Sequence, residues 1–524
     1  MKFFNTAGPV NCEDHYCLPL LKRFDLEELL YLIDAKKYFV LHAPRQTGKT
    51  SCLLALMKYL NDEGKYKCLY FNVEKAQSAR EDVKRGMRAI IGEIALRAKN
   101  FLDDDYPMNF RKEMLELAGE DAALNEMLSQ WAVRSKKPLV LFIDEIDSLI
   151  GDTLISVLRQ LRSGYDTKPD HFPQSIILCG VRDVRDYRIH SNREKKIITG
   201  GSAFNVKAKS LRLGDFSREE TEILYEAHTK DTGQIFADGT LDVVWELSEG
   251  QPWLVNALAY EVCFEIKANR NRSVKITPEM IRQAGENLIL RRETHIDQLA
   301  DKLKEKRVQR VIGPILSGVE NLEDIPVDDI MYVMDLGLIK KKGNIRISNQ
   351  LYKEIIPREL TFSTQHMISH QTEWYITESG TLDMEKLLSA FQEFFREHSE
   401  HWVERFQYKE AGPQLLLQAF LQRIINSGGR VEREYGLGSK RTDLMLLWRY
   451  EGGVQKVVIE LKILYKSLKK TISEGLKQTW EYMDKCGTEH GHLVIFDRGK
   501  KSWEEKIFRQ TKSFKDSEII VWGM

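Results

Sequence analysis

Short runs rich in apolar residues alternate with longer segments of helical periodicity over the first 215 residues. The runs occupy residues 38–41, 68–73, 139–143, 175–181 and 210–213. Nearly uninterrupted apolar runs of this length are typical of strands that are buried on both faces of a parallel sheet. Between them, residues 78–98 and 109–134 are predicted to be helical. Strands that alternate with helices predict an α/β fold with a doubly wound parallel sheet, whose ligand site lies at the carboxyl ends of the strands.

The pattern changes after residue 216. Residues 217–290 are predicted to be mainly helical, and residues 307–360 carry short helices. Two apolar runs flank Lys342, Gly343 and Asn344, which predicts a hairpin. Helices followed by such a hairpin favour a winged helix. Its lysines, residues 340–342, are either phosphate contacts or an ordinary solvated turn.

The turn after the first strand carries candidate phosphate-binding chemistry. Its residues are Ala43, Pro44, Arg45, Gln46, Thr47, Gly48, Lys49, Thr50 and Ser51. A strand, this turn and a following helix form the context of a P-loop, whose backbone N–H groups and helix N-terminus bind a polyphosphate. Lys49 is expected to reach the β- and γ-phosphates of ATP, and Thr50 to coordinate Mg²⁺. Ala43 replaces the usual first glycine, which is tolerated where φ is negative.

An acidic pair ends the third apolar run. Asp144 is predicted to hold the Mg²⁺ shell, and Glu145 to act as the catalytic residue that polarises the attacking water. Asp147 is a candidate for a supporting carboxylate. The alternative is that the acidic residues merely cap the next helix.

Three arginines follow the fourth apolar run, where ATPases of this kind sense the γ-phosphate. Arg182 is the first candidate for contact with the nucleotide, and Arg185 and Arg188 are further ones. Pairing of these arginines with Asp183 and Asp186 is an equally open interpretation. Contacts to the adenine base are expected from His15–Tyr16 and from the turn at residues 250–252, with aromatic packing and an ordinary helix start as the respective alternatives.

Composition places the chain among soluble globular proteins. It has 524 residues, 42% hydrophobic and 30% charged, which suits roughly two to four domains. Lys+Arg and Asp+Glu are equal at 78 each, so net charge neither favours nor excludes nucleic acid. Seven irregularly spaced cysteines indicate a reducing compartment, and Cys12 and Cys17 are too isolated for a zinc site. Without a signal peptide or a run of about 18 apolar residues, a cytoplasmic protein with no membrane partner is expected.

The C-terminal region carries a second candidate site. Asp443 opens an apolar strand after a glycine turn, and Glu460 and Lys462 lie two residues apart on the next strand, so they face the same side. Asp443 and Glu460 would bind Mg²⁺, which activates water for attack on a phosphodiester. Lys462 would orient or deprotonate that water. Gln478 shares one helix face with Tyr482.

These motifs resemble two known families. HAPRQTGKT, LFIDEID, GVRDVRDY, FNVKAKSLRL and GQPWLV are together similar to prokaryotic AAA-like ATPases, AAA+/STAND-related P-loop proteins with a helical lid and a winged helix. Asp443, Glu460-x-Lys462 and Gln478-x-x-x-Tyr482 resemble the PD-(D/E)xK nuclease superfamily, in its RecB-like branch, although Thr442 stands where that pattern has proline. This resemblance implies that Gln478 is a further catalytic residue and that Glu410 or Glu434 is a further carboxylate of that site.

The resemblances imply an arrangement of domains along the chain. They are an ATPase core at 1–215, a helical lid at 216–290, a winged-helix-like domain at 291–362, a linker at 363–394 and a small α/β restriction-endonuclease-like domain at 395–524.

Two functions remain open. In the first, the protein binds and hydrolyses ATP and couples its nucleotide state to a Mg²⁺-dependent nuclease that acts on DNA or RNA. In the second, it is an ATP-dependent regulatory switch whose C-terminal domain binds nucleic acid or a partner without cleaving it. The complete set of Asp443, Glu460 and Lys462 favours the first. Nucleic acid and a second copy of this chain are the candidate partners.

Overall fold

The computed structural model describes residues 2–184, 187–191, 196–291, 294–316, 322–342, 344–367, 375–405, 412–425, 429–437, 440–464, 467–497, 499 and 501–524. It divides into two compact units. The first comprises Met1–Arg291 and Ile330–Lys340, and the second comprises Arg292–Asp329 and Lys341–Met524. Among the described helices, none has the length and apolar character required to cross a membrane.

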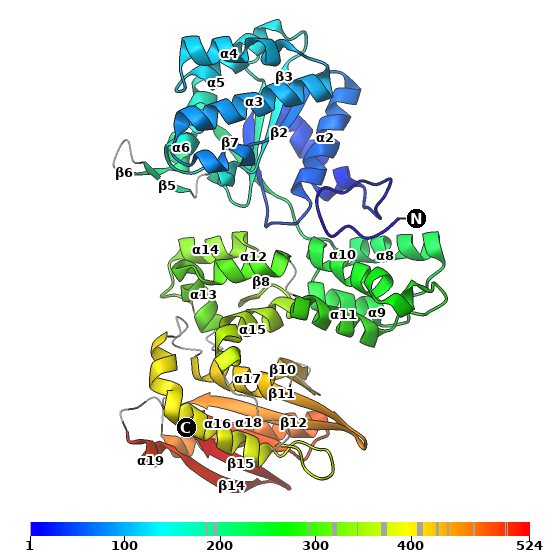
Figure 1. The fold of residues 1–524 in the computed structure, drawn as a ribbon, viewed down its shortest axis with the longest axis vertical. Coiled ribbons are helices and arrows are strands. Elements are labelled where there is room, and N and C mark those ends of the chain that lie inside the picture. Colours follow the sequence, from blue (N-terminus) through cyan, green and yellow to red (C-terminus); the bar gives the residue numbers. More distant parts are fainter. Residues whose placement is uncertain are drawn as a thin grey trace. The chain divides into compact units, whose positions relative to one another are not determined.

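The first unit is built on a five-stranded parallel sheet (Figure 1). The strand order is β2-β3-β4-β1-β7, and every neighbouring pair is parallel. The strands are β1 (Tyr38–His42), β2 (Lys67–Asn72), β3 (Leu139–Asp144), β4 (Ser175–Gly180) and β7 (Lys207–Arg212). The doubly wound α/β sheet predicted from the apolar runs is therefore confirmed.

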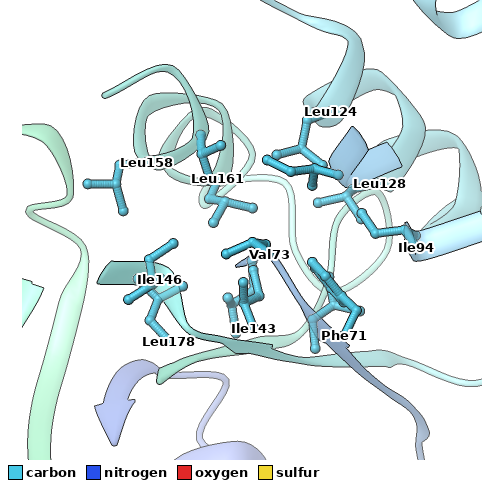
Figure 2. Packing of buried hydrophobic residues seen from close by; sticks show 14 of the residues in the cluster. Phe71, Val73, Ile94, Leu124, Leu128, Ile143, Ile146, Leu158, Leu161 and Leu178 are labelled. Atoms are coloured by element: carbon cyan, nitrogen blue, oxygen red, sulfur yellow. The ribbon is translucent and has the colours of Figure 1, made fainter. Parts of the chain in front are cut away.

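Helices cover both faces of this sheet, because alternate strand residues point to opposite sides. One face packs against α3 (Val83–Leu102), α5 (Ala123–Arg134) and α6 (Gly151–Ser163). The other packs against α1 (Leu26–Asp34) and α2 (Lys49–Glu63). Figure 2 shows Phe71, Ile143 and Leu178, from three neighbouring strands. They face Leu128 of α5 and Leu161 of α6. Burial on both faces explains why β1, β2, β3 and β4 are rich in apolar residues. The edge strand β7 has no buried residue and carries Lys207, Lys209 and Arg212.

Two helix predictions differ from the structure. The segment 109–134 forms two helices, α4 (Tyr106–Ala118) and α5, because the chain turns at Gly119 with a φ of 68° that favours glycine. The segment 78–98 forms α3, which starts later, at Val83. Asp82 caps that start by accepting a hydrogen bond from the Arg85 N–H at 3.0 Å.

The remainder of the first unit is mainly helical. Its elements are β5 (Arg188–Ser191), β6 (Lys196–Thr199), α7 (Gly200–Ala203), α8 (Arg218–Thr232), α9 (Thr240–Ser248), α10 (Pro252–Tyr260) and α11 (Pro278–Arg291). As predicted, Ser217 begins the helix α8. It forms a capping box with Glu220, in which each side chain bonds the other's backbone N–H.

The second unit contains a six-stranded mixed sheet in the order β10-β11-β12-β13-β15-β14. The strands are β10 (Gly429–Leu437), β11 (Lys440–Tyr450), β12 (Gly453–Ile463), β13 (Gly491–Phe496), β14 (Phe508–Phe514) and β15 (Ser517–Gly523). Helices α16 (Met384–Arg405) and α17 (Gly412–Ile425) pack on one face, and α18 (Leu468–Cys486) packs on the other (Figure 1). A short helix, α19 (Trp503–Lys506), precedes β14.

Shorter elements connect the two sheets along the chain. They are α12 (Thr294–Leu303), α13 (Lys306–Leu316), α14 (Val327–Asp335), β8 (Ile339–Lys342), β9 (Asn344–Ile347) and α15 (Gln350–Met367). Strands β8 and β9 form a two-stranded sheet at the place where a hairpin was predicted. Helix α15 runs into the range 363–394, which the sequence assigns to a linker, and α16 already begins within it.

Candidate functional site

The predicted phosphate-binding loop connects the carboxyl end of β1 to the first turn of α2. Its left-handed residues are Gln46, with a φ of 57°, and Gly48, with a φ of 89°; Ala43 is not among them. An alanine is therefore compatible with the backbone at the position of the usual first glycine. The Gly48 carbonyl accepts a hydrogen bond from the Cys52 N–H at 3.0 Å and so begins α2.

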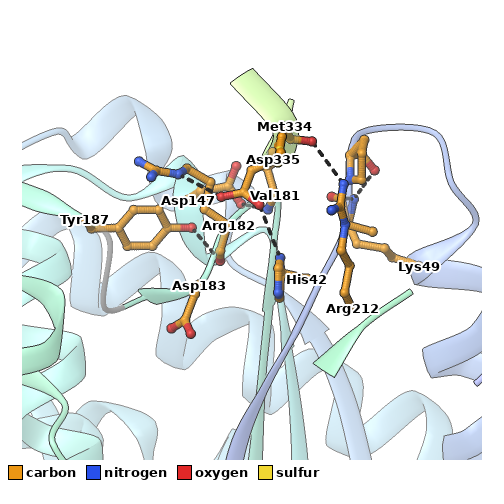
Figure 3. Close-up of polar contacts among 12 residues, drawn as sticks. His42, Lys49, Asp147, Val181, Arg182, Asp183, Tyr187, Arg212, Met334 and Asp335 are labelled. Atoms are coloured by element: carbon orange, nitrogen blue, oxygen red, sulfur yellow. Dashed lines mark hydrogen bonds and ion pairs between the residues drawn. The ribbon is translucent and has the colours of Figure 1, made fainter. Parts of the chain in front are cut away.

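Lys49 lies on the inner side of this loop (Figure 3). Its side chain is buried, and its Nζ donates to the carbonyl oxygens of Ala43 at 2.9 Å and Pro44 at 2.8 Å. The Thr47 hydroxyl donates to the same Pro44 oxygen at 2.8 Å. The ammonium is thus held where phosphate oxygens can replace the two carbonyls as its acceptors.

Thr50 and Asp144, distant in sequence, meet at the end of the loop. The Thr50 hydroxyl donates to Asp144 Oδ2 at 2.7 Å, and the Tyr70 hydroxyl donates to the same oxygen at 2.9 Å. Asp144 is fully buried, and its Oδ1 accepts from the Glu145 N–H at 2.9 Å. Mg²⁺ prefers hydroxyl and carboxylate oxygens of this kind. The residues present therefore fit the predicted Mg²⁺ of the nucleotide site.

Glu145 follows β3 directly and has a left-handed φ of 56°. Burial raises the pKa of its carboxyl, and the negative charges of Asp147 and Asp144 raise it further. Asp147 Oδ1 accepts a hydrogen bond from the Val181 N–H at 3.3 Å, so this carboxylate joins the end of β3 to the end of β4. A carboxylate with a raised pKa is a better acceptor for the proton of an attacking water.

The raised pKa of Glu145 predicts an acidic limb in the pH dependence of ATP hydrolysis. Protonation removes the base, so kcat/KM should fall as pH decreases, with a midpoint above the ordinary glutamate value of 4.5. Asp147→Asn keeps the oxygen that Val181 contacts but removes a neighbouring charge, and it should move the midpoint to lower pH. Titration of ATP itself affects both proteins equally. Identical midpoints in the two profiles would contradict this assignment.

The arginine predicted to sense the γ-phosphate pairs with a residue that sequence reasoning missed. Arg182 is buried, and its Nε lies 3.3 Å from Asp335 Oδ2 (Figure 3). Asp183, one of the two carboxylates proposed as partners for these arginines, pairs with Lys207. Arg185 lies outside the described residues, as does the side chain of Arg188.

A cavity of 110 Å³ adjoins the loop. Its lining includes Thr47 and Gly48 of the loop, Tyr16 of the N-terminal segment, and Pro252 and Trp253 at the start of α10. The sequence therefore identified two lining residues, Tyr16 and Pro252. Trp253 was not predicted as a contact; its Nε1 donates to the Thr6 carbonyl at 2.9 Å and ties α10 to the N-terminal segment.

The N-terminal segment is fastened beside the same cavity. The Val10 N–H donates to the Ser51 hydroxyl at 2.8 Å, so Ser51 positions this segment in addition to belonging to the loop. Cys12 and Cys17 are joined by a disulfide, which differs from the reduced state that the cysteine pattern indicated. The remaining cysteines are free thiols. Arg23, which the sequence did not single out, lines the cavity with its guanidinium 4.4 Å from the centre of the Phe216 ring.

The C-terminal candidate residues Glu460 and Lys462 lie together on β12. Glu460 is buried, and the Lys462 Nζ lies 2.6 Å from its Oε1. Asp443 precedes Leu444 on β11, and Leu444 pairs with Ile459, the residue before Glu460. The backbone register thus places positions 443 and 460 opposite each other on the neighbouring strands β11 and β12. The side chain of Asp443 lies outside the described part of the structure.

Helix α18 covers the face of the sheet that carries Glu460. Tyr482 is buried in the same hydrophobic cluster as Val458, two residues before Glu460, and Gln478 lies half-buried one turn earlier. Glu410 and the side chain of Glu434 lie outside the described residues. Within the part of the chain that the structure describes, no three acidic, histidine or cysteine side chains gather as metal ligands.

The hairpin lysines at positions 340 and 341 differ in their surroundings. Lys340 Nζ lies 2.7 Å from Asp215 Oδ2 and donates to the Glu249 carbonyl at 3.2 Å, so it is neither a solvated turn residue nor available to phosphate in this state. Lys341 is exposed. The side chain of Lys342 lies outside the described residues.

The parallel sheet, the loop around Lys49 and the Thr50–Asp144 contact define a Walker-type P-loop ATPase fold. The sequence profile of the AAA-like domain family matches residues 37–357, more than half of the chain, so the protein belongs to this family. No curated protein matches the sequence.

Several solved structures are similar to this chain at low identity. A Walker-type ATPase of Pyrococcus abyssi is 14% identical with a TM-score of 0.45, over 67% of this chain and 99% of that one. Cdc6p of Pyrobaculum aerophilum is 14% identical with a TM-score of 0.37, over 66% and 95%. Orc1 of Aeropyrum pernix, solved in complex with DNA, is 13% identical with a TM-score of 0.34, over 69% and 96%.

Proposed function

We propose that the protein binds ATP with Mg²⁺ and hydrolyses it at the loop between β1 and α2. The observation that carries this proposal is the 2.7 Å contact between the half-buried Thr50 and the buried Asp144, the two residues predicted to hold Mg²⁺. Thr50 and Asp144 would hold the ion, which neutralises phosphate charge when it is bound. Lys49 binds the phosphate oxygens in place of its present carbonyl acceptors.

Glu145 is the residue that orients and deprotonates the attacking water in this proposal. Its position directly after Asp144 and its raised pKa support that role. Calorimetry with ATP and Mg²⁺, followed by measurement of phosphate release, tests both parts of the proposal. Binding without phosphate release would leave a nucleotide-binding protein, and absence of binding would overturn the proposal.

The pair of the buried Glu460 and the half-buried Lys462 supports a second proposed activity, Mg²⁺-dependent cleavage of phosphodiester bonds in nucleic acid. An acidic oxygen 2.6 Å from an ammonium, beside the strand position of Asp443, supplies a metal ligand and a group that can orient water. In the competing regulatory proposal, the same sheet binds nucleic acid or a partner without cleavage. Nucleic acid is a candidate partner in both proposals.

Glu460→Gln should abolish cleavage, with a decrease of about 100-fold or more, because it removes a charged metal ligand while it preserves side-chain shape. The assay uses the full chain with Mg²⁺ or Mn²⁺, with and without ATP, on single- and double-stranded DNA and RNA. Glu489→Gln is the matched control, since Glu489 is exposed just beyond α18. Binding of nucleic acid by wild-type protein without any cleavage would favour the regulatory switch.

A further inference from the structure

The segment Ile330–Lys340 belongs to the ATPase unit, although the residues on both sides of it belong to the second unit. It comprises the end of α14, a turn at Gly337 and the start of β8. The chain therefore leaves the second unit, contacts the ATPase unit and returns. Any movement of this short segment is transmitted covalently to the second unit at both of its ends.

Asp335 anchors this segment beside the phosphate-binding loop. Asp335 is 4% exposed, and its carboxylate lies between two groups at the carboxyl end of the sheet. Arg182 Nε is 3.3 Å from Oδ2, and His42 Nδ1 is 3.9 Å from Oδ1 (Figure 3). His42 is the last residue of β1, and the next residue, Ala43, bonds to Gly180 at the end of β4. The carboxylate thus lies at the carboxyl ends of β1 and β4, beside the proposed nucleotide site.

Other contacts hold the same segment on the same site. Arg212, at the end of β7, donates to the Met334 carbonyl at 2.9 Å, and the Tyr332 ring lies 4.8 Å from the Arg182 guanidinium. At Gly337, whose φ is 79°, an added Cβ would lie only 2.9 Å from Pro44 of the loop. The turn therefore rests directly on the phosphate-binding loop, and a larger residue cannot be accommodated without displacement.

We propose that Asp335 is a positioning residue that holds Arg182 until the γ-phosphate of ATP competes for it. A buried carboxylate is stable only while it is paired, and a buried guanidinium likewise. The γ-phosphate is a second anion that Arg182 can bind, because two N–H groups of a guanidinium can donate to two phosphate oxygens at once. When Arg182 turns to the phosphate, Asp335 loses its closest partner, and the segment Ile330–Lys340 separates from the loop.

ATP and ADP consequently act differently on this segment. ADP lacks the γ-phosphate, so it leaves the pair of Arg182 and Asp335 in place. A ligand shifts an equilibrium only through its different affinity for the two states, and here that difference resides in one phosphate. The inference rests on the proposed ATP site and extends it with a route from the γ-phosphate to the second unit.

Hydrogen exchange on the full chain tests the inference without any mutation. The protein is measured alone, with Mg²⁺–ADP and with a Mg²⁺ complex of a non-hydrolysable ATP analogue, and calorimetry confirms that each nucleotide is bound. Amides of residues 330–340 should exchange faster with the ATP analogue and remain unchanged with ADP. Equal exchange with both bound nucleotides would overturn the inference. Failure to bind either nucleotide would overturn the proposed ATP site, and this inference with it.

Variants then separate positioning from ordinary structural support. Asp335→Asn should increase the affinity for the ATP analogue relative to ADP by about tenfold, since Arg182 no longer has to leave a carboxylate. Asp324→Asn, in an exposed part of the preceding turn, is the matched control and should not change this ratio. A change of both affinities by the same factor in Asp335→Asn would show a merely structural role and overturn the inference.

Gly337→Ala tests the docking of the same segment on the loop without altering any charge. The added methyl group meets Pro44, and the φ of 79° is strained for alanine, so residues 330–340 should exchange rapidly even without nucleotide. Addition of the ATP analogue should then cause little further increase. Slow exchange of this segment in a folded Gly337→Ala protein would contradict the docked position of the turn.

Discussion

Replacement of Lys49 by alanine is expected to weaken ATP binding strongly. Lys49 is buried inside the loop, where its ammonium is directed to the carbonyl oxygens of Ala43 and Pro44. Bound phosphates would replace those acceptors with full negative charges, in a site largely shielded from water. Removal of one member of a buried charge pair weakens binding by roughly 2–5 kcal/mol, or about 30-fold to several thousand-fold. Calorimetric titration with ATP and Mg²⁺ measures the loss.

The matched control for this experiment is Lys58→Ala. Lys58 lies on the same helix, α2, but is exposed, so its removal changes net charge equally without reaching the loop. ATP affinity should be retained in this control. Wild-type affinity in Lys49→Ala itself, with the fold intact by circular dichroism, would mean that ATP does not bind at this loop.

Replacement of Glu145 by glutamine should leave ATP binding intact and slow hydrolysis by about 10²- to 10⁴-fold, the usual contribution of general acid–base catalysis. Glutamine preserves the shape of the side chain but cannot accept the proton of the attacking water. Asp144 and Thr50 keep their 2.7 Å contact in this variant, so the Mg²⁺ ligands are unchanged. Single-turnover measurement of phosphate release separates the chemical step from binding and product release.

Glu116→Gln serves as the control for this second variant, because Glu116 is exposed on α4. Normal turnover in Glu145→Gln would show that a different group activates the water. Asp147 would then be the first residue to test, since it lies beside Glu145 and contributes to its raised pKa.

The amino-acid sequence by itself determined the parts of this protein that depend on local pattern. Apolar runs buried on both faces predicted the parallel strands, and the turn after the first of them predicted the loop around Lys49. The alanine at position 43 was correctly judged compatible, because backbone conformation at one residue follows from local sterics. Thr50 and Asp144 were each predicted to hold Mg²⁺ from their local motifs, and they lie 2.7 Å apart in the structure.

The C-terminal site was predictable only in part. Strand alternation correctly placed Glu460 and Lys462 on one side of β12, since side chains alternate with a period of two. The register of β11 and β12 brings Asp443 to the matching position, but register depends on the turn and on the hydrophobic partners across the sheet. The residue pattern along one strand does not contain that information.

Only the tertiary structure decided which residues from distant segments meet at the nucleotide site. Arg182 and Asp335 are 153 positions apart, and no periodicity or motif links them. The contact of Trp253 with Thr6 spans 247 positions. Such pairs form because a buried polar group requires a hydrogen-bond partner. The sequence contains many residues of the same chemical type, so it does not identify which of them becomes that partner. Local pattern therefore fixed the loop and its strands, whereas long-range packing selected Asp335 as the partner of the predicted sensor arginine.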